Sequence, residues 1–332
     1  MGGGDMKKAV FLGDRGNIDR VYAVTKDKLA EKLEFIEPVY DRECLERCAD
    51  VNYIFTTWGM WRFTKEQIAE CFPSLEAVFY AAGSVQSFAR EFIESEVKVF
   101  SAWGANAIPV AQFTVAEILL ALKGWYASVH RSGEIWHTHG GAREFPGIMD
   151  EKVGIVGAGT IGKLVIGALR AYPVEVLVYD KFMSEEKIAA LGGKKADLEE
   201  IFSECLVISN HLANLPATVG MLDYSLFSRM RSRATFINTG RGAQVVADDM
   251  IRALREDETR TALLDVTDPD EPPHEGSELY TMANVYLTPH IAGSMGNEIH
   301  RMAEFMYEEY MSLSEGGPTR FEVTAEMLAT MA

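Results

Sequence analysis

The sequence predicts an α/β protein with two doubly wound parallel sheets, each covered by helices. Short runs rich in β-branched and aromatic residues alternate with helix-like stretches through most of the 332 residues. This alternation pauses once, at a long apolar stretch with helical spacing, and then starts again. Alternating strands and crossover helices form parallel sheets, and one core rarely grows to this size. The pause therefore indicates two sheets in two domains.

The first group of elements precedes the pause. Strands are expected at residues 9–12, 53–56, 77–80 and 97–100. At residues 109–124 apolar side chains recur at helical spacing, which predicts a long and largely buried helix. A polar, glycine-rich connector follows at residues 130–146.

The second group of elements follows the connector. Strands are expected at residues 153–156, 174–179, 206–209, 235–238, 261–266 and 285–288. A final amphipathic helix is predicted at residues 296–314, because Gly316, Gly317 and Pro318 end its pattern. The two groups together predict two independent sheets.

The charge balance argues against two classes of partner. Lys and Arg total 32 and Asp and Glu total 49, which gives a net charge of −17. Such a field repels phosphate backbones and anionic lipid headgroups. The chain also has no run of 18 uninterrupted apolar residues. We therefore expect no nucleic-acid partner and no membrane span.

The N-terminal residues and the cysteines favour a cytoplasmic location. Residues 1–8 contain glycine and lysine but no apolar signal core. The four cysteines, Cys44, Cys48, Cys71 and Cys205, form no C-x-x-C pair, and free thiols suit a reducing compartment.

The strongest local motif lies between the first strand of the second group and the next helix. It has the spacing G-x-G-x-x-G and reads Gly157-Ala158-Gly159-Thr160-Ile161-Gly162. In this context the first glycine permits a tight turn, the second lets a pyrophosphate approach the main chain, and the third lets helix and strand pack closely. The helix N-terminus adds unpaired N–H groups that attract phosphate.

Asp180 completes this motif at the end of the next strand, 18 residues after the last glycine. Its carboxylate is expected to accept hydrogen bonds from the adenosine ribose diol and to repel a 2′-phosphate. NAD is therefore favoured over NADP, although the neighbouring Lys181 weakens the preference.

Three polar sequences follow three further strands of the second group. They are Asn238-Thr239-Gly240-Arg241-Gly242, Leu264-Asp265-Val266 and Thr288-Pro289-His290-Ile291-Ala292-Gly293. Taken singly, Arg241 reads as a surface ion pair, Asp265 as a cap and His290 as a hydrogen-bonded core histidine. Parallel sheets place their ligands at the carboxyl ends of strands. Three such residues at strand ends of one nucleotide-binding sheet therefore favour a functional site.

With these motifs in this order, the chain resembles the D-isomer specific 2-hydroxyacid dehydrogenase family. The resemblance runs from about residue 7 to 316 and is most specific in residues 106–293. It implies a Rossmann-type NAD-binding domain, residues 106–294, inserted into a flavodoxin-like substrate domain, residues 5–105 plus 295–332. The active site would lie in the cleft between these domains.

The resemblance also implies roles for individual residues. Arg241 would hold the substrate carboxylate, and His290 would be the general acid in reduction and the general base in oxidation. Substrate would also bind at Gly83 and Ser84. The residues expected at NAD are Gly157, Gly159, Thr160, Ile161, Gly162, Asp180, His211, Thr239, Gly240, Asp265 and Gly293. His211 is expected to pack beside NAD, and Asp265 to contact the nicotinamide carboxamide or its ribose.

The carboxylate that would orient His290 departs from the family pattern. The family places a glutamate, followed by proline, five residues after the aspartate that corresponds to Asp265. Here that position is Asp270, and the Glu271-Pro272 pair comes one residue later. We favour Glu271 on the assumption of a one-residue bulge, and Asp270 is the alternative.

Two loops of the first domain bear on the substrate. Val85 and Gln86 replace the acidic or amide residues that follow the glycine in the family. Residues 57–62 contain Trp58 and Trp61, which either line the pocket for a partly apolar substrate or pack between the two domains. No metal site is predicted, because no further ligands accompany His137 and His139.

We therefore predict an NAD-dependent oxidoreductase that interconverts a small D-2-hydroxy acid and its 2-keto acid. The resemblance implies a homodimer that forms through the helix at residues 109–124 and its connector. One alternative is an NAD-sensing, corepressor-like interaction protein on the same fold. Another is a dehydrogenase of formate or a similar one-carbon acid.

Overall fold

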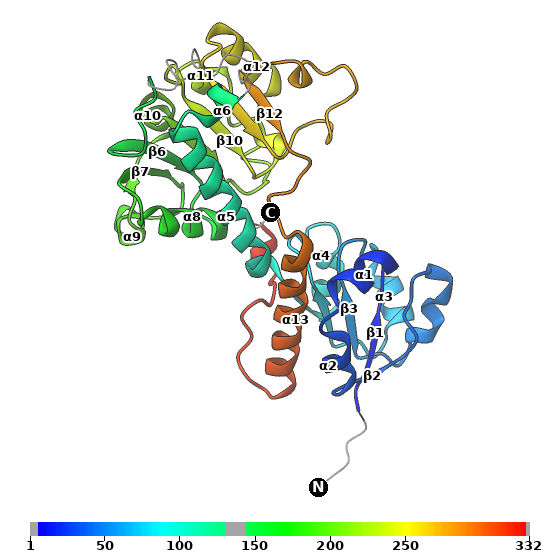
Figure 1. Ribbon diagram of the computed structural model, residues 1–332. Coiled ribbons are helices and arrows are strands. Elements are labelled where there is room, and N and C mark those ends of the chain that lie inside the picture. Colours follow the sequence, from blue (N-terminus) through cyan, green and yellow to red (C-terminus); the bar gives the residue numbers. More distant parts are fainter. Residues whose placement is uncertain (1–5, 130–143, 330–332) are drawn as a thin grey trace. The chain divides into compact units, whose positions relative to one another are not determined.

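The computed structural model describes residues 6–129 and 144–329 and contains two compact units (Figure 1). Unit 1 comprises Met1–Ala107 and Ser294–Ala332, and unit 2 comprises Ile108–Gly293. The divisions therefore fall after Ala107 and after Gly293, beside the sequence-based boundaries at residues 105 and 294.

Unit 1 contains a five-stranded parallel sheet with the order β2-β1-β3-β4-β5, which is the flavodoxin-like order. Its strands are β1 (Lys8–Phe11), β2 (Glu34–Phe35), β3 (Tyr53–Thr56), β4 (Ala77–Tyr80) and β5 (Lys98–Ser101). Its helical segments are α1 (Arg15–Val21), α2 (Lys26–Ala30), η1 (Arg42–Cys48), α3 (Lys65–Cys71), α4 (Ala89–Glu94), the start of α5 (Trp103–Leu122), η5 (Gly296–Glu298), α13 (Ile299–Ser314) and η6 (Met327–Ala329).

Aromatic side chains from successive strands form the core of unit 1 on the face that α13 covers. The rings of Phe55 and Phe79 stack with centroids 4.9 Å apart, and those of Phe79 and Phe100 do the same. Tyr310 of α13 meets Phe79 edge-on at 6.0 Å. A second apolar cluster covers the opposite face of the sheet beneath α3 and α4. Helices therefore cover both faces.

Unit 2 contains a seven-stranded parallel sheet with the order β12-β11-β10-β9-β6-β7-β8. Its strands are β6 (Glu151–Val156), β7 (Val174–Tyr179), β8 (Lys194–Lys195), β9 (Val207–Asn210), β10 (Thr235–Asn238), β11 (Thr261–Leu264) and β12 (Val285–Leu287). Its helical segments are the remainder of α5, α6 (Trp125–Val129), α8 (Thr160–Leu169), α9 (Glu185–Leu191), α10 (Leu198–Glu204), α11 (Tyr224–Phe227), η3 (Gly242–Gln244), α12 (Ala247–Glu256) and η4 (Glu278–Tyr280).

The strand order of unit 2 is that of a Rossmann fold. The order reverses at β6, since β7 lies on one side of it and β9 on the other. α5, α8 and α9 pack on one face of the sheet, and α10, α11 and α12 pack on the other. The predicted fold class, with two doubly wound parallel sheets, is confirmed.

The predicted start of the long helix was wrong, and two short strands were not predicted. α5 begins at Trp103, and Pro109 lies inside it rather than at its start. A proline at this position removes one backbone hydrogen bond, but Ala105, Ala107 and Ala111 are buried, so tertiary packing compensates for the loss. The two-residue strands β2 and β8 were missed because two residues show no periodicity.

By length and composition alone, α5 is long and apolar enough to span a membrane. Its 18-residue window has a mean hydropathy of 1.5, and 56% of that window is buried inside the structure. Core helices of globular proteins pass the same test, so this is weak evidence for a span. The packing of α5 against the sheet of unit 2 accounts for its apolar composition.

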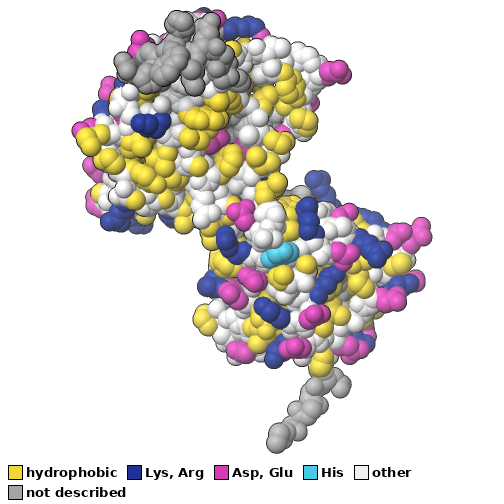
Figure 2. Space-filling view, viewed as in Figure 1, with side chains coloured by type: hydrophobic (Ala, Val, Ile, Leu, Met, Phe, Trp, Pro, Cys, Tyr) yellow, Lys and Arg dark blue, Asp and Glu magenta, His cyan; other side chains and the backbone are white. Residues whose placement is uncertain are grey.

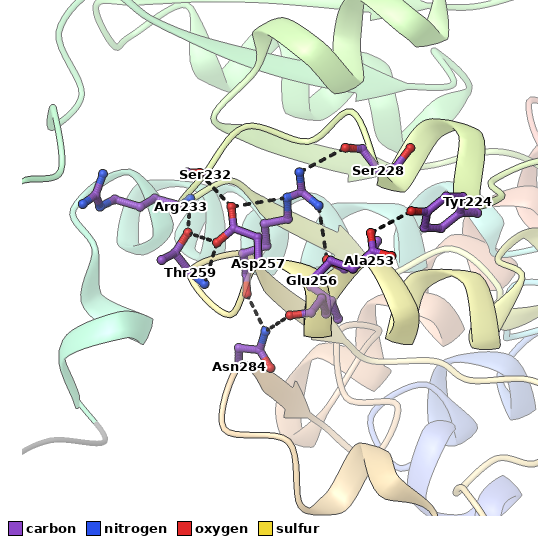
Figure 3. A network of polar contacts seen from close by, with 11 residues as sticks. Tyr224, Ser228, Ser232, Arg233, Ala253, Glu256, Asp257, Thr259 and Asn284 are labelled. Carbon is purple, nitrogen blue, oxygen red and sulfur yellow. Dashed lines mark hydrogen bonds and ion pairs between the residues drawn. The ribbon is translucent and has the colours of Figure 1, made fainter.

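A buried arginine stabilises the amino edge of the unit 2 sheet. Arg260 donates to Ala253 O at 3.1 Å and to Ser228 O at 3.0 Å, and its side chain is 11% exposed. Ala253 lies in the last turn of α12 and Ser228 is the C-cap of α11, and the carboxyl end of a helix favours a cation. Figure 3 shows Ser228 and Ala253 in this network, together with Asp257.

We expect Arg260→Met to lower the free energy of unfolding by about 1–3 kcal/mol. The methionine keeps the buried stem but leaves two carbonyl acceptors without a donor. Urea unfolding measures the effect, and Arg229→Met is the matched control on an exposed side chain with one main-chain bond. Equal losses in both variants would contradict the special role of Arg260.

Candidate active site

The glycine turn lies where the strand order of unit 2 reverses, directly after β6. Gly157 has φ +96°, which favours glycine, and a Cβ there would lie 2.7 Å from the carbonyl oxygen of His211. A Cβ on Gly162 would lie 2.1 Å from Gly157 O. Gly159 has no neighbour within 4 Å of a built Cβ. The turn is therefore tightly packed beneath Gly157 and open at Gly159.

The open side of the turn fits a dinucleotide pyrophosphate. Gly159 is the N-cap of the ten-residue helix α8, and no side chain caps its first N–H groups. Thr160 and Ile161 form the first turn of that helix. Unpaired N–H groups and the helix dipole together bind phosphate oxygens. The residues present therefore fit NAD at this position.

Asp180 follows β7 and braces the glycine turn from the side. Its Oδ2 accepts from Ala158 N at 2.9 Å, and its Oδ1 accepts from the N–H groups of Phe182 and Met183, each at 2.9 Å. A carboxylate has about four lone-pair positions, so room remains for a further donor such as a ribose hydroxyl.

His211 lies beneath the turn and is buried. Its Nε2 is 3.0 Å from Ser209 Oγ, and its main-chain N–H donates to Val156 O at 2.7 Å. Burial lowers the pKa of His211 to about 4. The imidazole is therefore neutral at pH 7.

Arg241 lies in the loop after β10, together with Thr239 and Gly240. Its Nη1 donates to Gly240 O at 2.7 Å. Burial lowers the pKa of the Arg241 guanidinium, and the Glu271 carboxylate opposes this shift. A Cβ on Gly242 would lie 2.1 Å from the carbonyl carbon of Thr267. Glycine at this position therefore lets the Arg241 loop approach the loop that leads to Glu271.

Glu271 contacts His290 directly. Its Oε1 lies 2.5 Å from His290 Nδ1, and both side chains are partly accessible. Asp270, the alternative partner, lies 3.6 Å from His274 instead. The hydrogen bond at Nδ1 orients the ring and leaves Nε2 as its second site for a proton.

Asp265 fixes the loop that carries His290. Its carboxylate accepts from Thr288 Oγ1 at 2.6 Å and from the N–H groups of Ile291 and Ala292 at 2.8 and 2.9 Å. These bonds flank His290, whose φ of +55° is unusual for a residue with a side chain. Asp265 is buried, with 3% of its surface exposed. These three hydrogen bonds all go to the loop that follows β12 and ends at Gly293.

The sequence interpretation missed Glu117, a buried acid on α5 beside this edge. Glu117 is 9% exposed, and its Oε2 has no hydrogen-bond partner in the described part of the chain. Burial, with a smaller contribution from the Asp265 carboxylate, raises the pKa of Glu117 to about 8. Three residues earlier on α5, Thr114 Oγ1 lies 3.2 Å from Thr239 Oγ1. The sequence signal that could have identified Glu117 is a single acidic residue within the otherwise apolar stretch of α5.

Gly83 and Ser84 belong to unit 1 and follow β4. Ser101 Oγ donates to the carbonyl oxygens of Ala82 and Gly83 at 3.0 and 2.5 Å, which fixes the start of this loop. Trp58 packs against both apolar clusters of unit 1, and Trp61 stacks near Arg42 at 5.4 Å. Both tryptophans therefore contribute to packing.

Within residues 6–129 and 144–329, no three His, Cys, Asp or Glu side chains are placed to hold a metal ion. His137 and His139 lie outside the described residues.

A Rossmann sheet with a glycine turn at its switch point and an Arg, Glu and His at adjoining strand ends defines the class of dinucleotide-dependent dehydrogenases. A family profile described as "D-isomer specific 2-hydroxyacid dehydrogenase, NAD binding domain" matches residues 118–292. The chain belongs to the D-isomer specific 2-hydroxyacid dehydrogenase family, and unit 2 carries its NAD-binding domain. The predicted family and cofactor are confirmed.

Several relatives carry different substrate names. The chain is 30% identical over 287 residues to D-3-phosphoglycerate dehydrogenase of Haemophilus influenzae. This match covers 83% of the chain and 67% of that protein. It is 26% identical over 315 residues to formate dehydrogenase of Neurospora crassa, covering 91% of the chain and 81% of that protein. The match to YoaD of Bacillus subtilis spans 58% of that protein, so the chain covers only part of some relatives.

Solved structures share the whole fold. Apo D-mandelate dehydrogenase of Rhodotorula graminis superposes with a TM-score of 0.81 at 21% identity, covering 96% of this chain and 98% of that one. A phosphoglycerate oxidoreductase of Rhizobium etli gives a TM-score of 0.80 at 19% identity, covering 97% and 99%. At these identities the likeness establishes the fold.

Proposed function

We propose that the protein is an NAD-dependent oxidoreductase that interconverts a small D-2-hydroxy acid and its 2-keto acid. The observation that carries this proposal is the position of the Glu271 carboxylate, which bonds to His290 and acts electrostatically on Arg241. The proposal is further supported by the positions of Arg241, Glu271 and His290, which follow the adjoining strands β10, β11 and β12 of the NAD-binding sheet.

Each of these groups has a chemical task. The Arg241 guanidinium offers planar paired donors for the substrate carboxylate and so fixes the adjoining carbonyl. Bound NAD(H) supplies or accepts the hydride. His290 Nε2 donates a proton to the substrate oxygen during reduction and removes it during oxidation. Glu271 keeps the ring oriented and stabilises the imidazolium.

The experiment that tests this function follows NADH absorbance with a panel of acids. The panel contains glyoxylate, pyruvate, hydroxypyruvate, 3-phosphohydroxypyruvate and bulkier 2-keto acids, and formate with NAD⁺ tests the one-carbon alternative. We expect turnover of at least one 2-keto acid. NADH binding without any turnover would contradict the proposal and favour the corepressor-like alternative.

Asp180 is proposed to set the preference for NAD over NADP. We expect Asp180→Ala to raise the ratio of kcat/KM for NADPH to that for NADH by about 10- to 100-fold, because a carboxylate that repels the 2′-phosphate is lost. Asp180→Asn removes the charge but keeps an oxygen that can accept the hydrogen bond from Ala158 N. Comparing the two variants therefore separates the effect of the charge from the effect of this hydrogen bond. An unchanged ratio in both variants would remove this role.

We also propose a homodimer in the cytoplasm. Exposed apolar side chains support the dimer, namely Leu120, Trp125, Val129, Met149 and Leu164 of unit 2. Figure 2 shows apolar side chains gathered on the face of unit 2 that carries α5 and α8. The four free thiols suit a reducing compartment. Light scattering after gel filtration is expected to give twice the chain mass, and a monomer would contradict the dimer.

A further inference from the structure

Three amide side chains form a closed network at the carboxyl edge of the unit 2 sheet. Asn210 is the last residue of β9, Asn238 is the last of β10, and the two are paired in register. Gln244 is the last residue of η3 and lies three residues after Arg241. At most 1% of the surface of each residue is exposed to solvent. Buried amides at the ends of apolar strands require hydrogen-bond partners, and here they find one another.

Asn210 is the centre of the network. Its Nδ2 donates to Asn238 Oδ1 at 3.0 Å and to Gln244 Oε1 at 2.6 Å. Its Oδ1 accepts from Leu212 N at 3.2 Å, and Leu212 O accepts from Gln244 Nε2 at 2.9 Å. Both main-chain polar groups of Leu212 are therefore held by this pair of amides.

The same amides hold the main chain of the Arg241 loop. Gly240 N donates to Asn238 Oδ1 at 3.1 Å, and Arg241 N donates to Gln244 Oε1 at 3.3 Å. Asn238 Nδ2 donates to Arg241 O at 3.1 Å. Arg241 therefore has its N–H and its carbonyl fixed by two different amides. A Cβ on Gly240 would lie 3.2 Å from both Asn210 Nδ2 and Gln244 Oε1, which leaves little room for this loop to shift.

The network also reaches the glycine turn. Asn210 pairs in register with Val156, the residue before Gly157. A Cβ on Gly157 would lie 2.9 Å from Leu212 N, so Leu212 packs against this turn. Hydrogen bonds at Leu212 and the packing of Leu212 against the turn therefore connect the turn that receives NAD to the loop that presents the substrate-binding cation.

We propose that Asn210 and Gln244 are positioning residues that hold Arg241 in its substrate-binding position. Neither touches the reacting atoms. Gln244 holds the Arg241 main chain directly, and Asn210 does so through Asn238 and Gln244. The guanidinium is then oriented before substrate arrives and loses little freedom on binding. The expected effect on KM rests on the proposed function. The expected effect on the main chain of the Arg241 loop rests only on the hydrogen-bond network.

The test uses Asn210→Leu, Gln244→Leu and the double variant in the full chain. Arg241 binds the carboxylate alike in ground and transition states, so its displacement raises KM rather than lowers kcat. We expect each single variant to raise the KM of the 2-keto acid about 10- to 100-fold and to change kcat about threefold or less. The dissociation constant of NADH is expected to change less than KM.

The double variant leaves Leu212 N, Leu212 O and Arg241 N without their side-chain partners. It should therefore be no more stable than either single variant, with a KM at least as high. One control separates positioning from general stability. Asn284→Leu is the matched control, because Asn284 Nδ2 donates to Leu254 O and Arg260 O at the opposite edge of the sheet. It should lower stability with KM unchanged.

Amide hydrogen exchange provides a readout that does not depend on turnover. We expect faster exchange at Gly240 and Arg241 in both single variants, and unchanged exchange there in Asn284→Leu. Unchanged exchange at these amides, or an unchanged KM in the double variant, would overturn the positioning role. Faster exchange in a protein that reduces no 2-keto acid would overturn the proposed function alone.

Discussion

His290→Asn is expected to lower kcat by about 10² to 10⁴-fold with little change in the dissociation constant of NADH. Asparagine lacks a group that gains and loses a proton near neutral pH, but it tolerates a positive φ like the +55° of His290. The loop that Asp265 fixes should therefore keep its shape. The loss in rate then reports proton transfer rather than a collapsed loop.

His274→Asn is the matched control for this experiment. His274 lies three residues after Glu271, is exposed, and faces Asp270 rather than His290. Its variant should keep the kcat and KM of the natural chain. Steady-state kinetics with the best acid of the panel and fluorescence titration of NADH supply the measurements. Equal activity in His290→Asn and the natural chain would remove His290 from proton transfer.

Glu117→Gln is expected to stabilise the protein increasingly as pH rises. Burial raises the folded-state pKa of Glu117 from 4.5 to about 8. A raised pKa means that the favourable contribution of the protonated acid is fully present below pH 4.5 and is lost as pH rises through 8. The cost of ionising this side chain is on the order of 3–5 kcal/mol across that window. Glutamine removes this cost.

The measurement is the free energy of unfolding in urea at pH 5 and pH 8 for both proteins. The difference between Glu117→Gln and the natural chain should grow by about 2–4 kcal/mol between these pH values. The ionisable groups that interact electrostatically with Glu117 are Asp265 and Tyr126. A difference that stays constant with pH would show that Glu117 ionises like an exposed glutamate.

Glu309→Gln is the contrasting control for a buried glutamate with full hydrogen bonding. Glu309 accepts from the N–H groups of Arg320 and Phe321 at 2.9 and 3.1 Å. Glutamine replaces one accepting oxygen with a donor, so this variant should lose stability where Glu117→Gln gains it. The two variants together distinguish Glu117, whose buried Oε2 lacks a hydrogen-bond partner among the described residues, from Glu309, whose Oε2 accepts two hydrogen bonds.

The His290–Glu271 pair illustrates how far the sequence reaches. The residue types and their places after β11 and β12 were readable, because strands and turns have local signatures. The choice between Glu271 and Asp270 was not readable, since it depends on a loop whose course is set by contacts with Thr267 and the neighbouring glycine at position 242. In the structure Glu271 bonds to His290, whereas Asp270 faces His274.

Asp265 and Asn210 illustrate why some assignments needed coordinates. The sequence predicted a contact between Asp265 and nicotinamide, which stays a prediction. The structure adds that its carboxylate accepts from the Thr288 hydroxyl before His290 and from two main-chain N–H groups after it. Asn210 drew no attention, because a single polar residue at a strand end carries no periodic signal. Its partners lie 28 and 34 residues away in the chain. Pairings at such separations are set by register between strands.

The sequence by itself determined the two parallel sheets, the glycine turn after β6 and the chemical types at the strand ends. These features depend on local spacing and on the few residues that each turn or strand tolerates. Tertiary structure alone decided which carboxylate contacts His290, which amides hold Arg241, and that Glu117 Oε2 is buried with no hydrogen-bond partner among the described residues. The physical reason is that burial and hydrogen-bond pairing arise only when segments far apart in the chain are packed together.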